Sequence, residues 1–131
     1  MALVPRVAHD DGHHRLGSDL GLRALGVALA LVAGGIHLVL SLVDLIPGET
    51  TTVPAFAAMG LGFLGCAALL ALRRVDLYVL VPVYAGLIVF AYAATRGQYP
   101  IEPIGLVSKA AEIGLALVAV ALMMRPARSP A

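Results

Sequence analysis

The stretch that decides the fold is residues 24–46, ALGVALALVAGGIHLVLSLVDLI. As a helix at about 1.5 Å per residue it is about 34 Å long, enough to cross the hydrocarbon core of a bilayer, which is about 30 Å thick. It carries one row of polar residues, His37, Ser41 and Asp44, whose spacing places the three side chains on one helix face. A polar row in a lipid-spanning helix has to face protein, water or a ligand, so this face is predicted to point inward.

Composition supports a membrane protein. The chain has 131 residues, of which 60% are hydrophobic and only 13% charged, whereas a soluble domain carries about 25% charged residues. The formal net charge of +1 says nothing about a nucleic-acid partner, and the lack of a basic patch with interleaved aromatics predicts none. Cys66 is the only cysteine, which excludes an intrachain disulfide and a cysteine-based metal site.

The apolar runs predict an all-α fold, an antiparallel bundle of four transmembrane helices over about 19–46, 54–72, 77–95 and 104–124. Residues 1–18 are predicted to form a flexible cytoplasmic tail and residues 125–131 a second, short one. Only RRVD separates the second and third helices, so these two should be antiparallel neighbours. Pro82 is predicted to bend the third helix and to free the carbonyl of Tyr78.

Basic residues set the expected orientation. Seven arginines lie before the first helix, between the second and third, or after the fourth, and only Arg96 lies in the opposite loops. The positive-inside rule therefore predicts that both termini are cytoplasmic, which four spans also require. The seven are Arg6, Arg15, Arg23, Arg73, Arg74, Arg125 and Arg128.

The fourth helix carries the second polar constellation. Lys109 and Glu112 are three residues apart and can pair on one helix face. Counted from the outer helix ends, His37 and Glu112 both lie about 12–14 Å deep, so they could meet if the first helix packs on the fourth. We therefore predict one inward-facing cluster, open toward the outer side, of His37, Ser41, Asp44, Tyr92, Ser108, Lys109 and Glu112.

The cluster has two interpretations. Ionisable residues inside a membrane are candidates for function, but buried polar groups also hydrogen-bond across helices and hold them in register, at roughly 0.6–2 kcal/mol each. The predicted N-terminal tail holds five residues of metal-ligating type, His9, Asp10, Asp11, His13 and His14. Their spacing fixes no metal geometry, so neither a metal site nor a cofactor is expected.

Small residues recur at four-residue spacing on the first two helices. Such rows let helix backbones approach closely, either within one bundle or in a homodimer. They comprise Gly26, Ala30 and Gly34 on the first helix and Ala58, Gly62 and Cys66 on the second.

The segments GGIHLVLSLVDL and SKAAEIGLAL, with the glycine-rich second span between them, carry a resemblance. The spanning region resembles small uncharacterised four-helix membrane proteins of prokaryotes, particularly haloarchaea, and more distantly the DoxX-like membrane proteins. The resemblance does not include the N-terminal tail. It implies an architecture and no mechanism.

Function is predicted at the level of class. No HExxH, GxSxG, CxxC or P-loop motif is present, so a non-enzymatic accessory or assembly component of the cell membrane is the first hypothesis, with a larger membrane-protein partner or a homodimer. The alternative is a transporter or sensor in which His37 and Glu112 bind a proton or a small solute, because histidine titrates near physiological pH. A redox subunit that uses a partner's quinone or haem is a third hypothesis.

Overall fold

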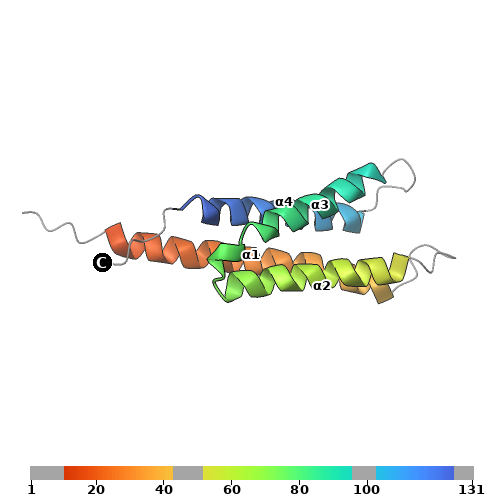
Figure 1. Ribbon diagram of the computed structural model, residues 1–131, viewed down its shortest axis with the longest axis horizontal. Coiled ribbons are helices and arrows are strands. Elements are labelled where there is room, and N and C mark those ends of the chain that lie inside the picture. The colour runs from red at the N-terminus through yellow and green to blue at the C-terminus, as the bar shows by residue number, and fades with distance from the viewer. Residues whose placement is uncertain (1–10, 43–51, 96–102, 126–131) are drawn as a thin grey trace, which may run out of the picture.

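The computed structural model describes residues 11–42, 52–95 and 103–125, and every regular element within them is helical. The elements are α1 (Asp11–Leu42), α2 (Thr52–Ala71), the 3₁₀ turn η1 (Val75–Leu77), α3 (Leu80–Ala94) and α4 (Pro103–Met123) (Figure 1). Within these described residues, four segments are long and apolar enough to cross a membrane: Gly17–Leu42, Pro54–Ala71, Val75–Ala94 and Pro103–Met123. The predicted all-α class with four candidate spans is confirmed.

The first helix begins earlier than its apolar run. α1 starts at Asp11 rather than at residue 19, so residues 11–18, predicted as part of a tail, are helical. No proline interrupts this segment, and each of its two glycines costs a helix only about 1 kcal/mol relative to alanine. The predicted end of this helix at residue 46 lies outside the described residues.

The C-terminus of α2 is closed by a Schellman motif. The Arg74 amide donates to the Leu69 carbonyl at 3.1 Å, and the Arg73 amide donates to the Leu70 carbonyl at 3.3 Å. Arg73 has a φ of 56°, which is the left-handed conformation that this motif requires. Glycine usually fills the position because a side chain there crowds the backbone.

The sequence predicts one continuous helix from residue 77 for the third span, and the structure differs. The chain forms η1 first, and α3 begins only at Leu80. This start places Pro82 in the first turn of α3, where a residue without an amide hydrogen removes no helical hydrogen bond. The predicted release of the Tyr78 carbonyl is wrong, because the Val81 amide donates to it at 3.1 Å.

Helix α1 contacts both α2 and α4, and α3 packs chiefly against α4. The core between them is rich in alanine, so the helices approach closely. Its fully buried members include Ala30 and Ala33 on α1, Phe63 and Leu70 on α2, Val81 and Ala85 on α3, and Leu115 and Ala119 on α4.

Glycine allows a close approach of α1 to α2. A Cβ atom on Gly60 would lie 2.6 Å from Leu38 Cγ and 3.0 Å from the Gly34 carbonyl oxygen. The small-residue row of α1 is thus used for packing within the chain. On α2, Gly62 faces the ring of Tyr84 from α3, and the Tyr84 hydroxyl donates to the Met59 carbonyl at 2.9 Å.

Candidate functional site

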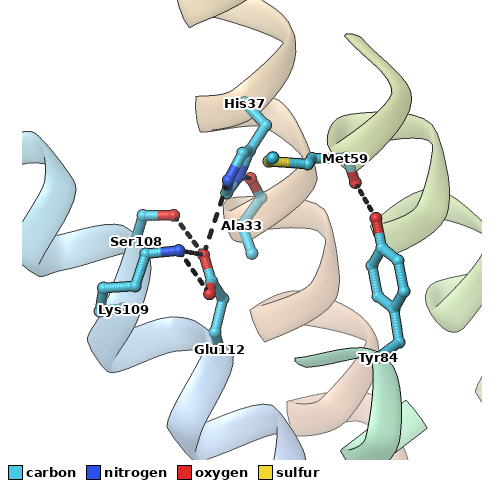
Figure 2. Close-up of polar contacts among 7 residues, drawn as sticks. All are labelled: Ala33, His37, Met59, Tyr84, Ser108, Lys109 and Glu112. Atoms are coloured by element: carbon cyan, nitrogen blue, oxygen red, sulfur yellow. Dashed lines mark hydrogen bonds and ion pairs between the residues drawn. The ribbon is translucent and has the colours of Figure 1, made fainter. Parts of the chain in front are cut away.

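A buried polar cluster lies where α1 faces α4 (Figure 2). Glu112 and Ser108 on α4 expose 0% and 2% of their surface, and His37 on α1 exposes 3%. Lys109 joins them at 8%. An ionised carboxylate and an ammonium in such a place have to be paired, because an uncompensated buried charge is strongly destabilising.

The carboxylate of Glu112 is satisfied from within its own helix. Lys109 Nζ donates to Oε1 at 2.5 Å and to Oε2 at 2.6 Å, and Ser108 Oγ donates to Oε1 at 2.8 Å. The three- and four-residue spacings bring these side chains together on one face of α4. The pair of Lys109 and Glu112 is therefore neutral as a unit without help from α1.

His37 supplies the polar contact from α1. Its Nδ1 lies 2.9 Å from the Ala33 carbonyl oxygen, which can only accept, so Nδ1 carries the hydrogen. In the neutral ring Nε2 is then without a proton. Nε2 faces Glu112 Oε1 at 3.8 Å, too far for a hydrogen bond and close enough for an ion pair once the ring is protonated (Figure 2).

Aromatic rings surround the cluster. The ring centroids of Phe63 and Phe56 lie 5.4 Å and 6.0 Å from that of His37, and Lys109 Nζ lies 5.2 Å from the centroid of Tyr92. Sequence reasoning missed Phe56 and Phe63 as neighbours of the histidine. Their seven-residue spacing, two helical turns, puts both on one face of α2 and could have indicated them.

Not every predicted cluster residue takes part. Ser41 is buried, but its hydroxyl donates to the Leu38 carbonyl at 2.7 Å and so stays within α1. Asp44 lies outside the described residues. The predicted opening toward the outer side would involve residues 43–51 and 96–102, which the structure does not describe either, so it stays a prediction.

The geometry of the cluster suits proton binding at His37. Among the described residues, no group of three or more metal-ligating side chains comes together, and Lys109 already occupies both oxygens of Glu112. The unprotonated nitrogen of an imidazole beside a carboxylate is a place where a proton can bind.

Residues 16–123 match the family model DUF7475, a family of unknown function. The chain belongs to the DUF7475 family. The matched range holds all the described residues of the polar cluster. No curated protein and no solved structure matches the chain. The resemblance to haloarchaeal and DoxX-like proteins therefore stays an expectation, and DUF7475 membership itself names no activity.

Proposed function

We propose that this DUF7475 protein is a small, non-enzymatic, multi-pass membrane protein in which His37 and Glu112 form a proton-sensing or proton-relaying contact between α1 and α4. The observation that carries the proposal is the geometry of His37. Its Nδ1 is committed to the Ala33 carbonyl, and its Nε2 faces Glu112 Oε1 at 3.8 Å.

The proposed setting is a bilayer crossed by four antiparallel spans, with both termini cytoplasmic. The four long apolar segments and the alternating course of the ribbons in Figure 1 support this arrangement. The arginine distribution supports the orientation, because all the basic residues outside the spans except Arg96 fall on one side.

Protonation would change the interface in a defined way. In the neutral state the bare Nε2 and the Glu112 carboxylate are both acceptors, so no hydrogen bond joins them. A proton on Nε2 makes the imidazole a donor and a cation, which is attracted to the carboxylate. The rings of Phe56 and Phe63 lie within cation–π range of that cation.

The same proton adds one positive charge to a neutral buried site. Such a charge is costly inside hydrocarbon, so the surroundings have to respond by drawing Glu112 toward His37, by admitting water or by releasing the Lys109 proton. Movement of Glu112 toward His37, or entry of water between them, would alter the packing of α1 on α4. Proton binding would thus be converted into a helix movement.

The test is a pH-dependent distance between α1 and α4 in lipid nanodiscs. Val39 and Val107 are 53% and 57% exposed and can each be replaced by a spin-labelled cysteine in a Cys66→Ala background. We expect the distance distribution to shift by on the order of 1–2 Å when the pH falls from about 8 to about 5.

Two variants test whether the pH-dependent shift in distance depends on His37. His37→Gln should abolish the shift, whereas Ser41→Ala should keep it, because the Ser41 hydroxyl bonds only within α1 in the described structure. A distribution that does not change with pH in the parent chain, or one that changes equally in His37→Gln, would contradict the proposal.

An accessory role in a larger assembly is the second candidate, and the exposed apolar face of α3, which lipid or a partner helix can cover, is where such a partner would pack. In an apolar 18-residue stretch of Val75–Ala94 only 17% of the residues are buried, against 39% in the corresponding stretch of Pro103–Met123. Its uncovered surface is apolar and includes Val83, Leu87 and Phe90. Native mass spectrometry after gentle extraction tests this role: a co-purifying larger subunit supports it, and a lone monomer or homo-oligomer contradicts it.

A further inference from the structure

A groove at the arginine-rich end of the molecule is separate from the polar cluster. It lies between the first turns of the α1 span and the end of α2, and its volume is about 190 Å³. Its apolar lining comes from Leu20, Ala24 and Val27 on α1 and from Leu70 and Ala71 on α2. Two charged side chains, Arg23 and Arg73, complete the lining.

The two groove arginines differ from the other described arginines at this end. Arg125 forms an ion pair with Asp19, and Arg74 pairs with Asp76 at 3.7 Å. Arg23 donates its Nε to the Asp19 carbonyl oxygen at 3.4 Å. Among the side chains that the structure describes, neither Arg23 nor Arg73 forms an ion pair with a carboxylate, so no described carboxylate compensates their two positive charges.

The backbone at Arg73 gives a second, independent observation. A left-handed φ of 56° costs a non-glycine residue roughly 1–2 kcal/mol, and glycine would close the same Schellman motif without that cost. The chain nevertheless has an arginine here, next to the groove that its side chain lines. The strain itself belongs to the helix end, but backbone strain also clusters at ligand-binding positions, which makes Arg73 a candidate for binding.

We propose that this groove binds an anionic phospholipid, with the phosphate held by Arg23 and Arg73 and the start of an acyl chain lying on the apolar lining. Guanidinium groups bind phosphate oxygens in a bidentate manner, and basic pockets between spans on the cytoplasmic side suit anionic headgroups. A zwitterionic headgroup carries a cation that the two arginines repel. The assignment rests on the proposed membrane location and orientation.

The experiment measures lipid binding by native mass spectrometry of the protein released from nanodiscs that contain phosphatidylcholine and phosphatidylglycerol. We expect phosphatidylglycerol to remain bound in preference to phosphatidylcholine. A charge near an anionic headgroup is worth about 1 kcal/mol, so loss of one arginine should weaken binding roughly fivefold, and loss of both about 25-fold.

The variants separate charge from folding. Arg73→Gly removes the charge and relieves the backbone, so its weaker binding cannot come from a damaged helix end. Arg23→Gln removes the other charge. Arg74→Gln is the matched control, because Arg74 neighbours Arg73, pairs with Asp76 and does not line the groove; its binding should be unchanged.

Three outcomes would overturn the lipid site. Equal losses in Arg74→Gln and Arg73→Gly would indicate general surface attraction, and equal retention of the two lipids would remove the selectivity. Displacement of the lipid by inorganic phosphate or glycerol phosphate alone would assign the groove to a free phosphate. Failure of the parent chain to float with liposomes would instead contradict the membrane location, so the two proposals fail in distinguishable ways.

Discussion

At the scale of single residues, the buried polar cluster depends on which hydrogen-bond donor meets which acceptor. Glu112 accepts three hydrogen bonds from Lys109 and Ser108 within α4, and His37 Nδ1 donates to the Ala33 carbonyl within α1. Both helices therefore satisfy most of their polar groups internally. The contact between His37 on α1 and Glu112 on α4 is electrostatic, and its strength depends on whether His37 carries a proton.

The pairing of Lys109 with Glu112 predicts a coupled stability effect. Glu112→Gln leaves a buried ammonium without its counter-charge and should lower the free energy of unfolding by about 3–5 kcal/mol. Adding Lys109→Met removes the orphaned charge, so the double variant should return close to the parent. Far-UV circular dichroism during denaturant unfolding in mild detergent measures all three. A double variant no more stable than Glu112→Gln would show that the pair is not coupled.

At the scale of the elements, close helix approach depends on particular glycines. The carbonyl of Gly34 and the side chain of Leu38 lie over Gly60. Gly35, one residue further along α1, has open space instead: no described atom outside its own helical turn lies within 4 Å of where its Cβ would be. Helix α1 therefore packs closely against α2 at Gly34 and not at Gly35.

Substitution at these positions should separate packing from helix propensity. Gly60→Ala should destabilise the fold by about 1–3 kcal/mol, because backbone and side chain of α1 must shift to admit a methyl group. Gly35→Ala, the control, should be neutral or stabilising by up to about 1 kcal/mol, since alanine favours the helix. Thermal unfolding in the same detergent compares them. Equal melting temperatures would mean that α1 and α2 do not meet at Gly60.

At the scale of the whole molecule, the sequence predicted what hydropathy and helix geometry control. Four apolar runs correspond to four helices, and the depth count put His37 and Glu112 at one level, where the structure places them 3.8 Å apart. The N-terminal extension of α1 to Asp11 was not predictable from hydropathy, because a helix can continue into polar sequence.

Other features depend on three-dimensional packing. Nothing in the sequence indicates that η1 precedes α3, or that Ala33 rather than Glu112 takes the closer contact with His37. The aromatic neighbours Phe56 and Phe63 come from α2, and a comparison of α1 with α4 alone could not reveal them.

Reporter fusions test the proposed orientation of the molecule in the membrane. With both termini cytoplasmic, a green fluorescent protein fused after residue 131 should fluoresce, and alkaline phosphatase fused at the same point should be inactive. A phosphatase fused after Arg96, in the loop predicted to be outside, should be active. The reverse pattern would contradict the arginine-based orientation and would place the groove of Arg23 and Arg73 on the outer side.

The proposed function depends on Nε2 of His37 being the proton-accepting atom that faces Glu112. Nitrogen-15 NMR of the imidazoles in lipid bilayers tests it, with His37→Gln used to assign the His37 signals among the four histidines of the chain. We expect a proton on Nδ1 and none on Nε2 at neutral pH, and a gain of the Nε2 proton on acidification. A proton on Nε2 alone at neutral pH, or His37 signals that do not change on acidification, would contradict it.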